Sequence, residues 1–221
     1  MSLLSEAQIR AMMPLAGDRL TPHLPYINRA LEWGDIVTPP DVTAFFAHLA
    51  HESGEYRYME EIADGSAYDQ RTDLGNTPEL DGDGQWFKGH GPIQITGHDA
   101  HLACGVALGI DLIKNPRLLC LPEYGTWSAA WFWTRFKPWL QPAAKLEWFH
   151  VTQRLVNGGE NGWVDRVQFY QRNRRLFGMP AYLPANEDRS IRDFQRSHGL
   201  GVDGAVGPRT LNALVTERKA A

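Results

Sequence analysis

The chain has 221 residues, 43% of them apolar, and carries a formal net charge of −4 at neutral pH. This length supports one sizeable core with a small appendage, but it is too short for two full enzyme domains. The negative charge provides no large positive field, which argues against nucleic acid or an anionic membrane as a partner. No run of eighteen apolar residues occurs, so we expect no membrane span.

The start of the chain and its cysteines indicate where the protein is made. The first residues, Met1 to Glu6, show no basic region followed by an apolar stretch, so we expect no signal peptide. Only Cys104 and Cys120 could pair, and one optional bridge is not the disulfide framework of a small secreted protein. We therefore expect synthesis in a reducing cytoplasm.

The first part of the chain has helical patterning. Apolar residues recur at helical spacing between residues 5 and 31, where three prolines divide them into short helices. Thr38-Pro39-Pro40-Asp41 has the pattern of a helix start, with a capping residue, proline in the first turn and an acid at the third position. The helix that follows is expected to end near Gly54, and it has one apolar stripe: Val42, Phe45, Phe46 and Leu49.

The middle of the chain differs in residue composition from the first part. Between Gly65 and Gly97 glycines fall among Asp, Asn and Thr, which is typical of turns and short strands. Helical patterning returns over residues 124–136, 146–156 and 163–177. The sequence therefore predicts a mainly α fold with a loop-rich, minor β region. Glycine and proline end the last of these helices, so we place the main domain at 1–178, a linker at 179–187 and a small helical segment at 188–221.

Glu52 occupies an unusual position for a carboxylate. It follows Phe45 by seven residues and Leu49 by three, so a continuing helix places it on the stripe that faces the core. Burial and the negative end of the helix dipole both disfavour the charged form, which suits a general acid near neutral pH. A hydrogen-bonded glutamate, or one turned to water beyond the helix end, is the alternative that the pattern leaves open.

Glu61 is a second candidate carboxylate. Nine residues at ~100° each would put it on the opposite side of an unbroken helix from Glu52, so the helix must break, and Gly54 supplies the break. The chain can then turn back and set Glu61 across a cleft from Glu52. Two carboxylates roughly 6.5–9.5 Å apart leave room for the water of inverting glycoside hydrolysis. Three nearby acids are rivals that could equally be solvated charges: Glu55, Glu60 and Asp64.

Metal binding is a competing hypothesis. The segment His48-Leu49-Ala50-His51-Glu52 lacks the spacing of the zinc-protease motif. Asp81-Gly82-Asp83-Gly84 lacks the closing glutamate of a calcium loop, so it predicts a turn. We therefore expect no metal, although five histidines raise the idea: His48, His51, His90, His98 and His101.

The aromatic residues divide into two groups. Those at helical spacing between residues 127 and 133 predict core packing. Tyr58 and Trp86 stand beside turns and polar residues, so they are candidates for stacking on a sugar ring, with ordinary packing as the alternative.

Four separated blocks resemble one known family. Phe45-Phe46-Ala47-His48 runs into His51-Glu52-Ser53-Gly54, and the next block is Gly89-His90-Gly91-Pro92-Ile93-Gln94-Ile95-Thr96-Gly97. Val156-Asn157-Gly158-Gly159 and Asp165-Arg166 complete the set. In this order they resemble glycoside hydrolase family 19, which contains chitinases and phage or bacterial lysozymes. The resemblance covers about residues 40 to 177.

This resemblance implies an α-helical, lysozyme-like catalytic domain and an inverting mechanism without a cofactor. Carried over by position, Glu52 is the acid, Glu61 is the base, and Thr96 holds the attacking water. Four further residues would bind sugar or support the carboxylates: His51, Gln94, Asn157 and Arg166.

The sequence departs from the family pattern at three places. The usual Gly-Arg-Gly reads Gly89-His90-Gly91, and Ala100-His101 replaces the Asn-Tyr often found after the Gln-x-Thr block. Tyr68-Asp69-Gln70-Arg71 stands where related endolysins often carry Tyr-Glu-Gly-Arg. Asp69 is therefore an alternative base.

The C-terminal segment resembles the peptidoglycan-binding domain of cell-wall hydrolases over Ile191–Leu200 and Val202–Leu211. That domain usually has a further helical segment ahead of the matched part, so this one is short and possesses only a small core. We expect it to dock on the catalytic domain, and a stabilising C-terminal cap is the alternative. The positions that the resemblance marks for wall binding are Phe194, Gln195, Asp203 and Gly204.

Together these observations predict an endolysin or lysozyme that hydrolyses the β-1,4 bond on the reducing side of N-acetylmuramic acid in bacterial peptidoglycan. We expect a monomer that binds glycan strands and acts on the cell wall after release from the host cytoplasm by lysis or a separate pore. A chitinase is the near alternative. A zinc amidase or peptidase, and a wall-binding protein with an inactive site, are alternatives of other classes.

Overall fold

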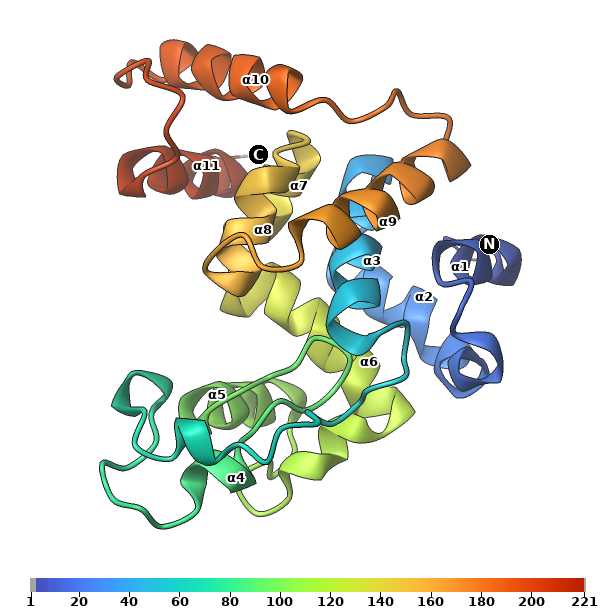
Figure 1. Cartoon of the computed structure of the whole chain (residues 1–221). Helices are drawn as coiled ribbons and strands as arrows, with labels where there is room; N and C mark the ends of the chain where they lie inside the picture. Colours follow the sequence, from blue (N-terminus) through green and yellow to red (C-terminus); the bar gives the residue numbers. More distant parts are fainter. Residues whose placement is uncertain (1–2, 221) are drawn as a thin grey trace. The chain divides into compact units, whose positions relative to one another are not determined.

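The computed structural model describes residues 3–220, and it is 62% helical with almost no strand (Figure 1). The predicted mainly α fold is therefore confirmed. The outermost ends of the predicted domains, residues 1–2 and 221, lie outside the described residues. The chain folds into two compact units, Met1–Asp35 with Leu49–Phe132 and Ile36–His48 with Trp133–Ala221.

The first unit contains helices at its start and around a loop-rich middle section. Isolated antiparallel bridges join His90 to Glu60 and to Ile95, and they are the minor β component that the glycine-rich sequence predicts. The helices of this unit are α1 (Glu6–Met12), η1 (Gly17–His23), α2 (Leu24–Trp33), η2 (Ser66–Tyr68), η3 (Thr72–Leu74), α4 (Asp83–Trp86), α5 (His98–Leu108), η4 (Pro116–Cys120) and α6 (Pro122–Trp131).

Helix α3 (Pro39–Ser53) supplies residues to both units, and the π-helical turn η5 (Phe132–Phe136) begins at the second boundary between them. The end of α3 at Ser53 confirms the helix end predicted near Gly54. The remaining helices belong to the second unit: α7 (Leu140–Lys145), α8 (Phe149–Asn157), α9 (Trp163–Leu176), α10 (Pro184–Ser197) and α11 (Pro208–Ala220).

The start of α3 shows a different use of its predicted capping residues. Thr38 accepts the first helical hydrogen bond through its carbonyl, but its side-chain Oγ1 has no hydrogen-bond partner among the described residues. Asp41 is buried, and its carboxylate accepts hydrogen bonds from Trp133 Nε1 at 2.7 Å and Gln141 Nε2 at 2.9 Å. The acid at the third position therefore ties α3 to η5 and α7.

The C-terminal segment packs on α7 and α8 rather than forming a core of its own. Its Phe194 ring contacts Trp148 edge to face at 5.2 Å, and Trp148 Nε1 donates to Ser190 Oγ at 2.9 Å. The segment does not separate at the predicted linker, because α10 begins inside it at Pro184. Docking on the body buries one shared apolar cluster: Ala143, Trp148, Ile191, Phe194 and Leu214.

Glu187 on α10 fixes this docking. Its carboxylate accepts hydrogen bonds from the backbone N–H groups of His150 and Val151 at 3.0 and 3.1 Å, and from the Tyr182 hydroxyl at 2.5 Å. It therefore caps the otherwise unsatisfied N-terminus of α8 from another helix. Burial raises the pKa of Glu187, although these hydrogen bonds work in the opposite direction.

His90 and His101, the two histidines at which the sequence departs from its family pattern, form a buried pair. His101 donates from Nδ1 to the Gly97 carbonyl at 2.8 Å, so its Nε2 is free to accept from His90 Nδ1 at 3.1 Å. This arrangement requires the His101 ring to be neutral, because its Nε2 must carry a lone pair. Burial is the main cause that lowers the pKa of each ring to about 4, and the neighbouring His101 ring contributes to this lowering at His90. The pair is thus a packed structural element.

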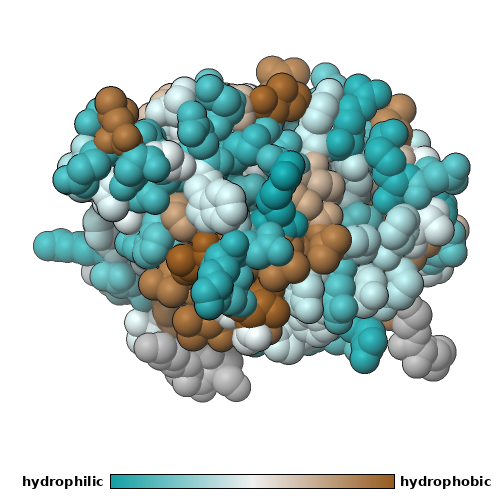
Figure 2. Space-filling model, turned by 90° about the horizontal axis from the view of Figure 1, so that it is seen from below, coloured by the Kyte–Doolittle hydropathy of each residue, from teal (hydrophilic) through white to brown (hydrophobic). Residues whose placement is uncertain are grey.

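The exposed surface mixes polar and apolar residues. Figure 2 shows one face of the molecule, on which brown apolar side chains gather in patches among teal hydrophilic ones. On the first unit, exposed apolar residues include Leu102 and Val106 of α5, which line a shallow hollow with Ile110 and Ile113. Within residues 3–220, no helix has the length and apolar character needed to span a membrane.

We expect the free energy of unfolding to fall as the pH is lowered from about 6.5 to about 4. In this window the unfolded chain protonates His101, whereas the folded state keeps it neutral, so the unfolded state binds more protons. The full contribution is present above the unfolded pKa of about 6.5 and is lost toward the folded pKa of about 4. The loss for this residue reaches up to about 3 kcal/mol.

Denaturant unfolding at about pH 7 and about pH 4.5 measures this dependence. His101→Asn removes the titrating ring, so the stability of that variant should depend less steeply on pH than that of the wild type. Equal slopes for the two proteins would contradict the assignment of the buried neutral pair.

Candidate active site

A left-handed turn directly follows α3. Gly54, Glu55 and Tyr56 have φ values of 53°, 56° and 61°, so three successive residues lie in a region that L side chains rarely adopt. Ser53 stabilises the turn, because its Oγ donates to the Leu49 carbonyl at 2.7 Å and accepts from Tyr56 N at 2.9 Å. The turn ends the helix at Ser53 and reverses the direction of the chain.

Glu52 stands in the last turn of α3, two residues before Gly54, and its side chain is half-buried. Glu55 is buried in contrast, and its carboxylate accepts a hydrogen bond from Leu15 N at 2.6 Å. This bond holds the left-handed turn against the start of the chain. Glu55 therefore has a structural role, and Glu52 is the more exposed of the two carboxylates at the end of α3.

The other rival acids also have local partners. Glu60 forms ion pairs with Arg117 at 2.6 Å and Lys88 at 3.0 Å. Burial acts to raise the pKa of Glu60, but hydrogen bonds from Arg117 and Lys88 outweigh it and hold the pKa below its ordinary value. Asp64 accepts hydrogen bonds from the backbone and hydroxyl of Ser66, which lower its pKa.

Glu61 is held by both oxygens of its carboxylate. Tyr68 donates its hydroxyl to Oε1 at 2.9 Å, and the backbone N–H of Gly89 donates to Oε2 at 2.9 Å. The backbone of Glu61 also donates to the Gly89 carbonyl at 2.8 Å. The orientation of this half-buried carboxylate is therefore fixed by the Tyr68 hydroxyl and the Gly89 backbone.

Gly89 is where the Glu61 and Gln94 side chains converge. A Cβ at this position would lie 2.5 Å from Gln94 Oε1 and 3.2 Å from Glu61 Oε2, so a larger residue would displace one of them. Gln94 has a φ of 56°, and its Nε2 donates to the Gly91 carbonyl at 2.8 Å. Thr96 donates its hydroxyl to the Gln94 carbonyl at 3.0 Å. The Gly-x-Gly-Pro-x-Gln-x-Thr pattern thus brings the Gln94 side chain beside Glu61 at Gly89, and it ties Thr96 to the Gln94 backbone.

Asp69, the alternative base, has a different environment. It is buried, and its Oδ1 accepts hydrogen bonds from Gly82 N at 3.0 Å and Gly84 N at 2.8 Å. A Cβ at Gly84 would lie 2.4 Å from the Asp69 backbone nitrogen, so the two segments are in close contact. The Asp69 carboxylate therefore organises the Asp81–Gly84 turn.

The candidate sugar-stacking residues are both exposed in the first unit. Tyr58 is 39% exposed, and its ring packs against Gly54 of the left-handed turn. Trp86 is 50% exposed and is anchored by a hydrogen bond from Nε1 to the Ile113 carbonyl at 2.9 Å. His51 is half-buried on the last turn of α3. Their roles in sugar binding stay predictions.

Asn157 and Arg166 belong to the second unit. Arg166 is buried and donates from a terminal nitrogen to His48 Nδ1 at 3.0 Å, while His48 Nε2 donates to Thr152 Oγ1 at 2.9 Å. Asn157 is exposed at the end of α8 and donates to the Asn161 carbonyl at 3.1 Å. His48 thus has a structural partner on each ring nitrogen, and the functional roles of Asn157 and Arg166 stay predictions.

The histidines have specific partners that account for their clustering in the sequence. His98 lies 3.3 Å from an Asp99 oxygen, and the other central histidines form the His90–His101 and His48–Arg166 contacts. Over the part of the chain that the structure describes, no group of three or more His, Cys, Asp or Glu side chains is placed to hold a metal ion. Cys104 and Cys120 are free thiols.

The positions expected to bind the wall differ in exposure. Phe194 and Gln195 are buried, and Gln195 donates to Asp203 Oδ1 at 2.8 Å and accepts from Gly204 N at 2.9 Å. Direct wall contact by Phe194 and Gln195 is therefore corrected to an internal role, because one packs on Trp148 and the other closes the loop at residues 203–205. Asp203 and Gly204 remain at the surface or partly so.

Two groups at the site are not predicted from the sequence. Tyr68 stands beside Asp69 in the Tyr-Asp-Gln-Arg stretch, and in the structure its hydroxyl binds Glu61. Gly89 begins the Gly-His-Gly motif, and its backbone N–H is the second donor. Both residues lie at the edges of family-like blocks, but nothing in their spacing indicates that they meet at Glu61.

Comparison with known proteins places these motifs in a family context. The family model described as chitinase class I matches residues 34–145, and that described as a putative peptidoglycan binding domain matches residues 188–214. An endochitinase of Arabidopsis thaliana is 30% identical over 162 residues, which are 71% of this chain and 61% of the relative. Endochitinase 4 of Solanum tuberosum is 32% identical over 190 residues, covering 66% and 62%. The chain spans less than two thirds of these relatives.

Solved structures share the fold. Chitinase C from Streptomyces griseus HUT6037 superposes with a TM-score of 0.68 at 22% identity, covering 82% of this chain and 96% of that protein. A bacterial family 19 chitinase gives a TM-score of 0.61 at 26% identity, covering 81% and 97%. The predicted lysozyme-like helical fold agrees with both. Since the chitinase class I model covers half of the sequence, including Glu52, Glu61 and Thr96, the chain belongs to glycoside hydrolase family 19.

Proposed function

We propose that this protein hydrolyses β-1,4 glycosidic bonds of bacterial peptidoglycan by an inverting acid and base mechanism, as an endolysin-type N-acetylmuramidase. The observation that carries the proposal is the double anchoring of Glu61 by Tyr68 and Gly89, beside Gln94, within the unit that also contains Glu52. An oriented second carboxylate is what a water-activating base requires.

In this mechanism Glu52 is the general acid. Its proton passes to the glycosidic oxygen as the bond from that oxygen to the anomeric carbon breaks. Glu61, as a carboxylate, takes a proton from water while the water oxygen bonds to the anomeric carbon from the opposite face. The product therefore has the inverted configuration at that carbon, and the two glutamates exchange their protonation states.

Thr96 supports the water in this proposal. Because its hydroxyl proton is committed to the Gln94 carbonyl, its oxygen presents lone pairs that can accept a hydrogen bond from the water. The water oxygen then has a lone pair free to attack. Gln94 in turn is held by Gly91, so the chain Gly91, Gln94 and Thr96 is rigid before substrate arrives.

The choice of peptidoglycan rests on the C-terminal segment. Its match to the putative peptidoglycan binding domain supports a bacterial wall polymer. A chitinase acting on polymers of N-acetylglucosamine is the second candidate, because the curated relatives are endochitinases and the similar structures are chitinases. Both candidates use the same acid and base, so the sugars released from the polymer distinguish them.

We expect purified peptidoglycan treated with the wild-type protein to release fragments with new reducing ends at N-acetylmuramic acid. Mass spectrometry after borohydride reduction identifies the reduced sugar. Glu52→Gln preserves the side-chain shape but has no transferable proton, so release should fall by about 10²–10⁴-fold. Glu123→Gln, an exposed change on α6 of the same unit, is the matched control and should leave activity unchanged.

Other products of this reaction would indicate other functions. Reduced glucosamine ends, or release from chitin alone, would replace the muramidase proposal with the second candidate. New amino groups with intact glycan strands, lost on adding a chelator, would indicate a metal-dependent amidase or peptidase. Binding without any fragment would indicate an inactive wall-binding protein.

Glu61→Gln and Asp69→Asn separate the two candidate bases. Glu61→Gln should lower kcat by about 10²–10⁴-fold, because it removes the group that accepts the proton from water. Asp69→Asn keeps an oxygen that can accept from Gly82 and Gly84, so it should lower thermal stability modestly and kcat by less than about tenfold. Measured kcat values in the reverse order would assign the base to Asp69.

Tyr68→Phe tests the anchoring of the base. Burial and the hydrogen bond to Glu61 raise the pKa of the Tyr68 phenol, so it stays protonated and donates near neutral pH. Loss of this donor leaves the Glu61 carboxylate with its hydrogen bond from Gly89 but without its second anchor, so it is less well oriented and kcat should fall by about tenfold with little change in KM. Tyr124→Phe is the control, since the Tyr124 hydroxyl has no hydrogen bond within the described residues. An unchanged kcat for Tyr68→Phe would refute this positioning role.

A further inference from the structure

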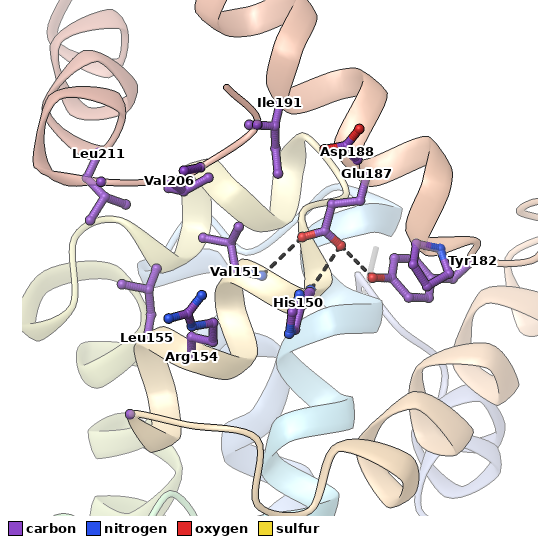
Figure 3. Close-up of a pocket in the computed structure, with 15 residues that line it drawn as sticks. His150, Val151, Arg154, Leu155, Tyr182, Glu187, Asp188, Ile191, Val206 and Leu211 are labelled. Atoms are coloured by element: carbon purple, nitrogen blue, oxygen red, sulfur yellow. Dashed lines mark hydrogen bonds between the residues drawn. The ribbon is translucent and has the colours of Figure 1, made fainter. Parts of the chain in front are cut away.

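The second unit contains a pocket on α8, and its lining includes none of the residues assigned to chemistry. Its volume is about 560 Å³, which lies in the range of small-ligand sites (Figure 3). One wall is α8, with Val151, Arg154 and Leu155. The opposite wall is the C-terminal segment, with Ile191, the loop at residues 204–207 and Leu211. The pocket therefore exists only because the segment docks on α8.

Both walls are fixed in place. Glu187 binds the first turn of α8 through the backbone N–H groups of His150 and Val151. The loop opposite is closed by Gln195, whose amide group bonds Asp203, Gly204 and Ala205. Gly204 has a φ of 76°, and a Cβ there would lie 2.6 Å from an Asp188 oxygen, so the loop lies tightly against α10.

The lining combines aliphatic side chains with polar groups, and one of its charged groups is an arginine without a partner among the described residues. Figure 3 shows Val151 and Leu155 on α8 facing Val206 and Leu211 across the pocket. The charged groups at the rim are otherwise paired, Asp188 with Arg192 at 3.0 Å and His150 with Glu160 at 2.9 Å. The exposed guanidinium of Arg154 has no hydrogen bond or ion pair among the residues that the structure describes. Because the lining carboxylates of Glu187 and Asp188 are engaged by other groups, the pocket offers aliphatic surface and one positive charge without a partner.

This chemistry suits a peptide better than a sugar. Carbohydrate sites present the face of an aromatic ring, but the only aromatic ring in the lining besides His150 is Tyr182. That ring is buried against Tyr170 and Phe149, and its hydroxyl is bound to Glu187. Small aliphatic side chains fit methyl groups, and a free guanidinium fits a carboxylate.

We propose that this pocket binds the short peptide stem of peptidoglycan, with alanine methyl groups against Val151, Leu155 and Val206 and a peptide carboxylate on Arg154. The inference rests on the proposed peptidoglycan substrate, because the stem is the part of that polymer with aliphatic groups and carboxylates side by side. The short C-terminal segment forms one wall of this binding pocket, and α8 forms the other. Bond cleavage and peptide binding then use different parts of the chain.

The test measures binding and needs no hydrolysis. The probe is the free tetrapeptide of alanine, glutamate, diaminopimelate and alanine, titrated into the full-length Glu52→Gln protein by calorimetry. We expect Arg154→Ala in this background to weaken binding by about tenfold or more, because it removes the charged partner of the carboxylate. Arg196→Ala is the matched control, since Arg196 is an exposed arginine of α10 paired with Asp193 and outside the pocket.

Amide chemical shifts locate the site independently. Binding should shift the amides of residues 151–158 and 204–207, and Val206→Asp should abolish these shifts by placing a negative charge opposite Arg154. No binding of the tetrapeptide, equal affinity of the Arg154→Ala protein, or shifts confined to other residues would overturn the inference. Glucosamine oligomers displacing the tetrapeptide would also overturn it. Fragment release by the wild-type protein is measured separately, so failure of the peptide site and failure of the proposed hydrolysis give different results.

Discussion

The left-handed turn at Gly54, Glu55 and Tyr56 is the constraint on which the arrangement of the candidate site depends. Two of its three residues carry side chains in a backbone region that costs roughly 1–2 kcal/mol each. The cost is offset locally, because Ser53 bonds the Tyr56 backbone, Glu55 bonds Leu15, and the Tyr56 ring packs on His23. A helix that ran on would carry residue 61 away from the strand-like segment at Gly89, where its carboxylate is now held.

The same principle of buried polar groups with assigned partners recurs through the molecule. The Asp41 carboxylate accepts hydrogen bonds from Trp133 and Gln141. The His48 ring is hydrogen-bonded to Arg166 and Thr152. His90 donates a hydrogen bond to His101. An unpaired buried group of this kind would cost about 1–3 kcal/mol, so each pairing fixes the position of a helix or loop. The loop-rich region has few of the regular backbone hydrogen bonds that stabilise helices and sheets, and side-chain hydrogen bonds of this kind stabilise it instead.

Local patterns in the sequence predicted the ends of α3, the helical content and the glycine-rich middle section, because these depend on neighbouring residues. Such local patterns do not predict contacts between segments that are distant in the sequence. Nothing in the spacing indicated that His90 meets His101, that Tyr68 binds Glu61, or that Asp69 organises the turn at Gly82. The acidic residue of the α3 start, Asp41, fits a capping pattern, yet the fold uses it to bind a tryptophan 92 residues away. The sequence patterns identified the candidate groups, whereas the partner of each group depends on how the chain packs.

The C-terminal segment shows how a short module can be completed by the body to which it is attached. Two helices of this size cannot bury enough apolar surface to fold alone. By capping α8 with Glu187 and inserting Phe194 against Trp148, the segment gains a core and a charged anchor at once. The anchor is directional, because only the N-terminus of a helix offers free N–H groups to a carboxylate. It therefore fixes the register of α10 on α8, and the loop carrying Val206 must then face Arg154.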